Sequence, residues 1–199
     1  SIKKNENNTV DLTYNFHLGE IAKIKKINFI GNKIFSDGTL RNIIISEEDK
    51  FWKFITRNKF LDSNRINADV FRLENFYKNR GYYNVKIKST SAIINNANQF
   101  EIIFNINSGE KYYFNDVQII NNNNIQIENF KIFQDKFSKL KGEKYSKKKI
   151  TNIVNDLNNF TLKNDFIFVN ATFEEIINKE NKININIIFE DVEKNYVER

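Results

Sequence analysis

The sequence has 199 residues, enough for one large domain or two small ones. It carries 31 Lys and Arg against 25 Asp and Glu, a net charge of +6, and it contains no Cys or Pro. Without Cys, disulfides, thiolate metal sites and cysteine nucleophiles are excluded, and no apolar run approaches the roughly 18 residues that a membrane-spanning helix needs. The opposite charges are interspersed, so we interpret the basic excess, including Lys147 to Lys149, as solvated surface.

The N-terminal half shows one strand and then a complete unit of strand, helix, helix, strand, strand. Residues 10–17 alternate as a strand does, and the first 20 residues lack a signal-peptide pattern, so we expect an internal piece or mature fragment of a longer chain. The predicted elements of the unit are a strand at 22–30, a helix at 37–45, a helix at 63–79 and strands at 82–94 and 99–107. A long connection, 46–61, separates the two helices.

The C-terminal half predicts the same order of elements. They are a strand at 112–120, a helix at 127–139, a helix at 147–163 and strands at 166–177 and 182–190. The turn-prone segments 95–98 and 178–181 join the last two strands of each unit.

The two units correspond residue by residue in their second helices. The apolar stripe Ile66, Val70, Leu73 and Phe76 recurs 84 positions later (150 minus 66) as Ile150, Val154, Leu157 and Phe160. Asp62 and Ser146 stand at matching positions as N-caps. We therefore predict that the same fold occurs twice in the chain, and that each copy folds around its own core.

Three glycines stand where the predicted elements end or turn. Gly31 follows the first strand of the unit, Gly81 follows its second helix and Gly109 follows its last strand. Glycine adopts left-handed backbone conformations without steric cost, so we predict that all three are structural turn residues.

Several stretches resemble the POTRA family, the periplasmic modules of BamA-type outer-membrane assembly factors. They are INFIGNKIFS at 27–36, FYKNRGYY at 76–83, FNINSGEKY at 104–112 and GEKYS at 142–146. Asp165 and Val192 depart from the pattern, because the family usually has Gly at both places. The resemblance implies an α+β fold of two tandem βααββ modules, each with a three-stranded mixed sheet, the last strand central, and two helices on one face.

The resemblance also implies how the chain is divided. Residues 1–20 would end a preceding module, 21–109 would form a third-repeat-like module and 110–192 a fourth-repeat-like one, with 193–199 beginning the next. The long connection at 46–61 is the feature similar to the third repeat of BamA.

The function implied is that of a periplasmic arm of an outer-membrane protein in a Gram-negative bacterium. Its expected partners are unfolded β-barrel precursors, accessory lipoproteins and a C-terminal membrane barrel of the same chain, with no nucleic acid and no cofactor or metal. Partners would bind partly by β-augmentation, in which an incoming strand pairs with an open sheet edge. The predicted docking edge is the second strand of the first module, with the candidates Tyr83, Val85, Lys86, Ile87, Lys88, Thr90 and Ala92.

Each candidate also has a purely structural explanation. Lysines on an edge strand commonly prevent aggregation. Phe51, Trp52 and Phe54 could form an exposed contact cluster, although we favour their covering the bottom of a small core. Tyr82 and Tyr83 are expected to pack inside the protein.

Other functions find less support. The same architecture would suit the arm of a two-partner secretion transporter or a TamA-like translocator, and a small basic RNA-binding protein is the rival from another class. Catalysis is not expected: His17 is the only His, no nucleotide-binding or nucleophile motif is present, and Glu47-Glu48 and Glu174-Glu175 are chain neighbours that point apart.

Overall fold

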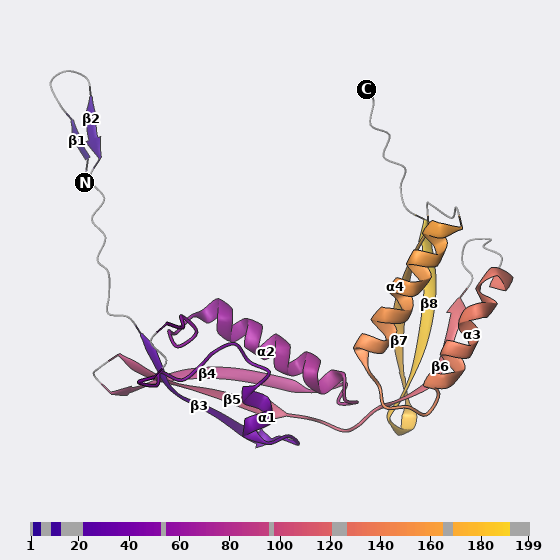
Figure 1. Ribbon diagram of the computed structural model, residues 1–199, viewed down its shortest axis with the longest axis horizontal. Coiled ribbons are helices and arrows are strands. Elements are labelled where there is room, and N and C mark those ends of the chain that lie inside the picture. The colour runs from indigo at the N-terminus through magenta and orange to yellow at the C-terminus, as the bar shows by residue number, and fades with distance from the viewer. Residues whose placement is uncertain are drawn as a thin grey trace.

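The computed structural model describes residues 2–4, 9–12, 22–52, 55–95, 98–120, 127–164 and 169–191. Within them the chain forms two α+β modules joined end to end (Figure 1). Several sequence-based expectations lie outside the described residues: residues 13–17 of the first strand, Phe54, the helix exit at Asp165, and residues 193–199.

Both modules have the predicted order of elements. The first consists of β3 (Lys23–Asn32), α1 (Asp37–Arg41), α2 (Ser63–Lys78), β4 (Lys86–Asn95) and β5 (Gln99–Asn107). The second consists of β6 (Tyr113–Ile120), the 3-10 helix η1 (Ile127–Phe133), α3 (Gln134–Leu140), α4 (Lys147–Lys163), β7 (Val169–Asn178), the 3-10 turn η2 (Lys179–Asn181) and β8 (Lys182–Asp191).

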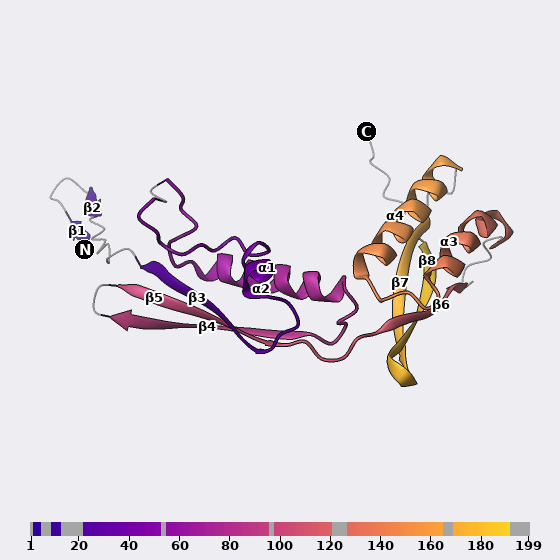
Figure 2. The same cartoon turned by 60° about the horizontal axis from the view of Figure 1, so that its bottom comes forward.

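Each module contains one three-stranded mixed sheet. The strand order is β3-β5-β4 in the first sheet and β6-β8-β7 in the second, so the last strand of each module is central. The central strand runs parallel to the first strand and antiparallel to the second. The helices cover one face of each sheet, as Figure 2 shows for α1 and α2 above β3, β4 and β5. The predicted α+β fold with tandem modules is confirmed.

Two separate hydrophobic cores hold the modules together. Leu73 of α2 is fully buried against β3 and β5 of the first module, and its counterpart Leu157 of α4 is fully buried against the second sheet. Ile66 and Ile150 are buried as well. Full burial of such a side chain contributes about 1.5–3 kcal/mol, so the repeated stripe accounts for the position of both long helices.

Both long helices begin at the predicted caps. The carboxylate of Asp62 accepts a hydrogen bond from the N–H of Arg65 at 3.1 Å, and the hydroxyl of Ser146 accepts one from the N–H of Lys149 at 3.4 Å. A cap of this kind stabilises a helix by about 1 kcal/mol.

The glycines predicted as turn residues all have positive φ, +87° at Gly31, +98° at Gly81 and +64° at Gly109. A Cβ on Gly31 would lie 2.5 Å from the side-chain oxygen of Asn105 and the carbonyl oxygen of Ile106, closer than atoms approach. Both the backbone conformation and the space at this position therefore require glycine.

The first helix is shorter than the predicted span 37–45 and ends at Arg41. The cause is Asp69 of α2, which is fully buried and accepts hydrogen bonds from the N–H groups of Ile45 at 2.6 Å and Ser46 at 3.0 Å. These two N–H groups donate to the Asp69 carboxylate and not to the carbonyl groups of a continuing helix. In the second module, the predicted helix 127–139 divides into η1 and α3.

The second strand of the first module begins at Lys86, not at residue 82 as predicted. The chain first makes a tight turn in which the N–H of Tyr82 bonds the carbonyl of Tyr77 at 3.1 Å and the N–H of Val85 bonds that of Tyr82 at 3.3 Å. In the second module β7 is described from Val169, and residues 166–168 of the predicted strand lie outside the described part.

Near the N-terminus, β1 (Ile2–Lys4) pairs antiparallel with β2 (Val10–Leu12). The preceding module expected at residues 1–20 stays a prediction. Across the described residues, no helix combines the length and the apolar character needed to cross a membrane.

Candidate strand-docking edge

The second strand of the first module lies at the outside of its sheet. β4 pairs along its length with β5 and lies at the end of the strand order, so one side of its backbone faces away from the sheet. Ten residues at about 3.3 Å each give an edge of about 33 Å. An edge of this length presents enough N–H and C=O groups to pair with an extended peptide.

The side chains of β4 alternate as predicted over its first half. Lys86, Lys88 and Thr90 are exposed, whereas Ile87 is buried under α2. Beyond Thr90 the alternation ends, because Ser91, Ala92, Ile93 and Ile94 are all exposed. The far half of β4 therefore offers apolar side chains and free backbone together.

Two of the residues assigned to this edge by the sequence do not belong to it. Tyr83 lies in the turn before β4 and packs against the core of the second module, with its ring 5.6 Å from that of Tyr112 and 5.0 Å from that of Tyr145. Val85 is buried in the first core. The turn at residues 82–85 removes both from the ladder, so the edge begins at Lys86.

The opposite edge of this sheet, β3, is covered by the long connection at 46–61. The N–H of Ile24 donates to the carbonyl of Lys59 at 2.8 Å, and the carbonyl of Ile24 accepts from the N–H of Asp49 at 2.7 Å. An antiparallel bridge between Lys23 and Phe60 continues this cover. The backbone groups at this end of β3 are therefore already paired.

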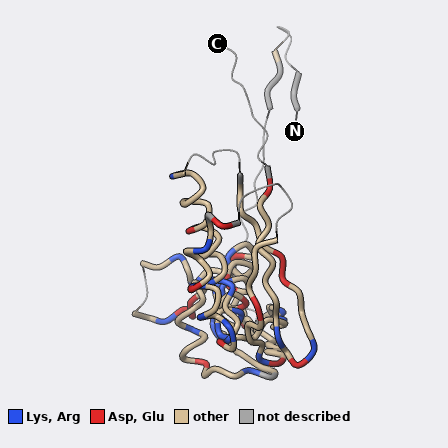
Figure 3. The backbone as a smooth tube through the Cα atoms, turned by 90° about the vertical axis from the view of Figure 1, so that its right-hand side faces the viewer, with Lys and Arg blue, Asp and Glu red and all other residues tan. Residues whose placement is uncertain are grey.

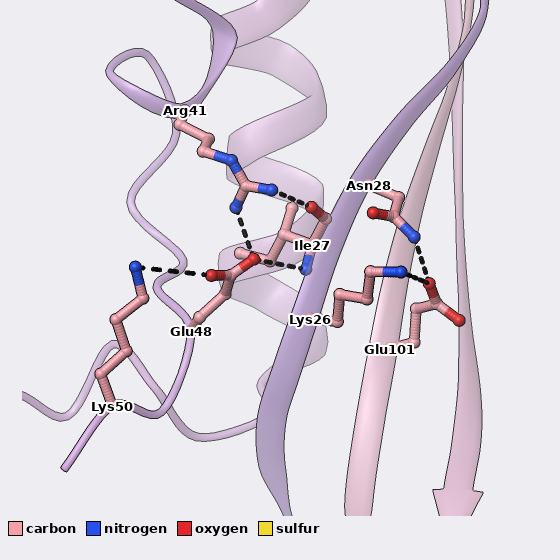
Figure 4. A network of polar contacts seen from close by, with 7 residues as sticks. All are labelled: Lys26, Ile27, Asn28, Arg41, Glu48, Lys50 and Glu101. Atoms are coloured by element: carbon pink, nitrogen blue, oxygen red, sulfur yellow. Dashed lines mark hydrogen bonds and ion pairs between the residues drawn. The ribbon is translucent and has the colours of Figure 1, made fainter. Parts of the chain in front are cut away.

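Farther along β3, two side chains take the place of a neighbouring strand (Figure 4). The carboxylate of Glu48 accepts from the N–H of Ile27 at 3.1 Å, and Arg41 donates to the carbonyl of the same residue. Arg41 also bonds Glu48 at 2.6 Å, and Lys50 lies 3.7 Å from that carboxylate. We call this arrangement the Arg41–Glu48 clamp.

The clamp keeps Glu48 ionised. Burial by itself would raise the pKa of Glu48, but the hydrogen bonds from Ile27 and Arg41 and the charges of Arg41 and Lys50 outweigh it, so the pKa lies below its ordinary value. A carboxylate held in this way closes the edge at neutral pH. Sequence reasoning missed it, because nothing in the chain marks Glu48 as the partner of a strand.

Two aromatic residues of the long connection, Phe51 and Trp52, are exposed. Phe51 is 84% exposed and Trp52 57%, and their rings contact each other edge to face at 4.6 Å. The preferred expectation that they cover a core is wrong for both residues, since the connection turns outward after it has paired with β3. Neighbouring Ile55 is 94% exposed.

Tyrosines join the two modules. The N–H of Tyr112 donates to the carbonyl of Gly81 at 2.7 Å, and the side chain of Asn84 donates to the hydroxyl of Tyr112 at 2.7 Å. Burial, together with a hydrogen bond to Glu175, raises the pKa of Tyr83 to about 12. Sequence reasoning assigned Tyr83 to a partner-binding edge, whereas it fixes the junction.

Figure 3 shows the positions of basic and acidic residues interspersed along the backbone. No group of three or more potential ligands that could hold a metal ion occurs among the residues with a described position. The β4 edge offers outward backbone groups, the exposed lysines Lys86 and Lys88, and exposed apolar side chains at Ile93 and Ile94.

The fold defines a class of protein, those built from tandem βααββ modules. Residues 22–109 match the POTRA family, described as "Surface antigen variable number repeat", and the second module repeats the same fold. The chain thus contains one module that matches the POTRA family, followed by a second module of the same fold.

Its relatives are assembly factors. The chain is 24% identical over 183 residues to outer membrane protein assembly factor BamA of Neisseria meningitidis serogroup B, covering 91% of this chain and 23% of that protein. It is 24% identical over 197 residues to BamA of Buchnera aphidicola, covering 96% and 31%. The chain spans less than a third of the length of these curated relatives.

A solved structure shares the fold. The crystal structure of Haemophilus influenzae BamA POTRA3-5 superposes with a TM-score of 0.66 at 18% identity, covering 86% of this chain and 66% of that one.

Proposed function

We propose that this chain is the periplasmic POTRA arm of an outer-membrane protein assembly factor. It acts by binding and not by catalysis: it takes up unfolded β-barrel precursors and accessory lipoproteins, partly by adding their strands to β4. The likeness to BamA proteins supports the assembly role, and the open ladder of β4 supports the mode of binding. The assignment of the modules as the third and fourth repeats belongs to the same proposal.

The observation that carries the proposal is the asymmetry of the first sheet. The edge at β3 is paired by the chain itself at Ile24 and Ile27, whereas β4 pairs only with β5 among the described residues. Backbone pairing makes little demand on sequence, which suits an arm that handles many different precursors.

The rival interpretation, RNA binding, needs aromatic and basic side chains together on an open sheet face. The aromatic residues Phe29 and Phe104 stack on each other at 5.5 Å and are buried under the helices. Lys26, Asn28 and Lys88 lie on the face of the sheet away from the helices, and no aromatic pair lies there among the described residues. The structure therefore favours protein strands over RNA as the ligand.

Proline substitutions at neighbouring positions of β4 test the proposal. Of two successive amides in a strand, one faces the paired neighbour and one faces away. Pro at Ser89 and at Thr90, made separately, should therefore have different effects: one variant unfolds the hairpin, and the other keeps the fold but loses an outward N–H.

The assay is fluorescence anisotropy with a urea-denatured outer-membrane β-barrel protein diluted into the purified chain. The folded variant is expected to bind at least about tenfold more weakly than the wild type. The same barrel protein, already folded in detergent, is the control ligand and should not bind. Equal binding of the denatured protein by the folded proline variant and the wild type would refute docking at β4.

A further inference from the structure

The two modules treat the edge of their first strand differently. β3 and β6 match in register, since Ile24 and Ile27 lie opposite Phe100 and Ile102 of β5, and Phe114 and Val117 lie opposite Ile183 and Ile185 of β8. Each strand also has its irregularity between these two residues. Phe114 and Val117 are therefore the structural counterparts of Ile24 and Ile27.

The first of these positions is closed in both modules. The N–H of Phe114 donates to the carbonyl of Glu143 at 2.9 Å, and its carbonyl accepts from the N–H of Gly142 at 2.8 Å. An antiparallel bridge between Tyr113 and Lys144 completes this cover. In both modules, therefore, a connecting segment of the chain pairs antiparallel with the beginning of the first strand: 141–146 with β6, and 46–61 with β3.

The second position is closed only in the first module. The N–H and C=O of Ile27 are held by the Arg41–Glu48 clamp (Figure 4). Because Val117 is the counterpart of Ile27, its N–H and C=O point away from β8. Among the described residues, neither a side-chain clamp nor a backbone group bonds to them. The second module has a short connection, 141–146, in place of the long one at 46–61, and no described residue of that connection bonds to the backbone of Val117.

A groove of about 480 Å³ lies beside the open part of β6. Its other wall consists of Gln134, Phe137 and Ser138 on one face of α3 and of Lys141, which directly follows the helix. The apolar floor consists of Phe130 and Phe137, which are almost fully buried. The groove can therefore take apolar side chains from a ligand whose backbone pairs with β6.

We propose that the β6 edge of the second module, from Asp116 to Ile119, is a second docking site for an extended peptide strand. The incoming strand pairs antiparallel with β6 and places alternate apolar side chains in the groove below α3. A polypeptide strand is the ligand that fits, because segments of the chain itself already pair with the edge of β3 in the first module and with the beginning of β6 in the second. The walls carry one acid, Asp116, and one base, Lys141, so the groove selects for neither sign of charge.

The β6 site is separate from β4, so it can be tested independently of the proposed function. The probe is a synthetic ten-residue peptide in which Thr alternates with Val and Ile, flanked by Lys for solubility. Amide hydrogen exchange, measured by NMR on the whole chain with and without peptide, reports each edge separately. Protection is expected at the amide of Val117 and not at that of Ile27.

Two controls define the mode of binding. The same peptide with alternate amides N-methylated cannot extend a ladder and should leave β6 unprotected. Ser138→Trp fills the groove from an exposed position of α3 and should weaken protection of β6 about tenfold or more. Lys139→Trp, exposed on the same helix but outside the groove, should bind like the wild type.

Opening the first module provides the converse test. The double variant Arg41→Ala, Glu48→Ala removes the clamp, and the peptide should then protect Ile27 as well. The proposal is overturned if the peptide leaves Val117 unprotected in the wild type, or if the N-methylated peptide protects it equally. Protection at β4 alone would leave the proposed function standing and remove this second site.

Discussion

Replacing Asp69 tests how a single buried side chain shapes the first module. Its carboxylate is fully buried and accepts two backbone hydrogen bonds, from Ile45 and Ser46. A hydrogen bond to a charged group contributes about 1.5–3 kcal/mol, and a buried amide left without a partner is costly. Asp69→Ala should therefore lower the free energy of unfolding by about 3–5 kcal/mol, and Asp69→Asn, which keeps one acceptor oxygen, by about half as much.

Urea unfolding measures the effect. Circular dichroism follows both modules, and the fluorescence of Trp52, the only Trp of the sequence, follows the first. The matched control is Asp156→Ala on α4, which removes an exposed carboxylate paired with Lys136 at 2.6 Å. It should cost less than about 1 kcal/mol. A loss below about 1 kcal/mol for Asp69→Ala would refute the role given to this carboxylate.

Three further predictions concern the junction and the clamp. Gly81→Ala should lower the free energy of unfolding in urea by about 1–2 kcal/mol, because φ is +98° and the new Cβ would lie 2.9 Å from the side chain of Lys111. The control Gly38→Ala should not destabilise the chain, because Gly38 has open space around it and no positive φ. Glu48 has a folded-state pKa below its ordinary 4.5, so its contribution to stability is complete above pH 4.5 and is lost as pH falls through the lowered value. Glu48→Gln should therefore flatten the acid limb of the unfolding free energy, and an unchanged limb would contradict the clamp. Tyr83→Ala should broaden the distribution of inter-module orientations in residual dipolar couplings, whereas an unchanged orientation would show that Tyr83 does not fix the junction.

The fold could be predicted from the sequence because the strongest sequence signals are local and occur in both modules. The stripe from Ile66 to Phe76, its copy 84 residues later and the caps at Asp62 and Ser146 depend on helix periodicity and on the chemistry of a helix end. Such signals need no knowledge of distant contacts. They place the long helices to within one residue and give the order of the strands.

Two of the missed features depend on contacts between residues far apart in the chain, and a third depends on a local turn. Asp69 ends the first helix from a different element, and Glu48 closes an edge that lies 21 residues earlier. Tyr83 looked like part of an edge strand because its alternation with Val85 and Ile87 continues that of β4. The turn that takes it into the next module is made by backbone bonds at Tyr82 and Val85, which periodicity cannot reveal.

The candidate site was predicted in part. The sequence indicated the strand that carries the exposed residues Lys86 and Lys88, but not that the opposite edge would be paired at Ile24 and Ile27. That closure matters for function, since a sheet with two open edges could join other chains indiscriminately. In the proposed function, the long connection limits strand addition in the first module to β4.

Hydrogen exchange of the whole chain, with a urea-denatured outer-membrane β-barrel protein as ligand, tests the central claim most directly. Strand addition predicts slower exchange of the backbone amides in β4 and β6, with no change in β3. Slower exchange confined to the surfaces of α2 and α4, or no change in either edge strand, would contradict the account.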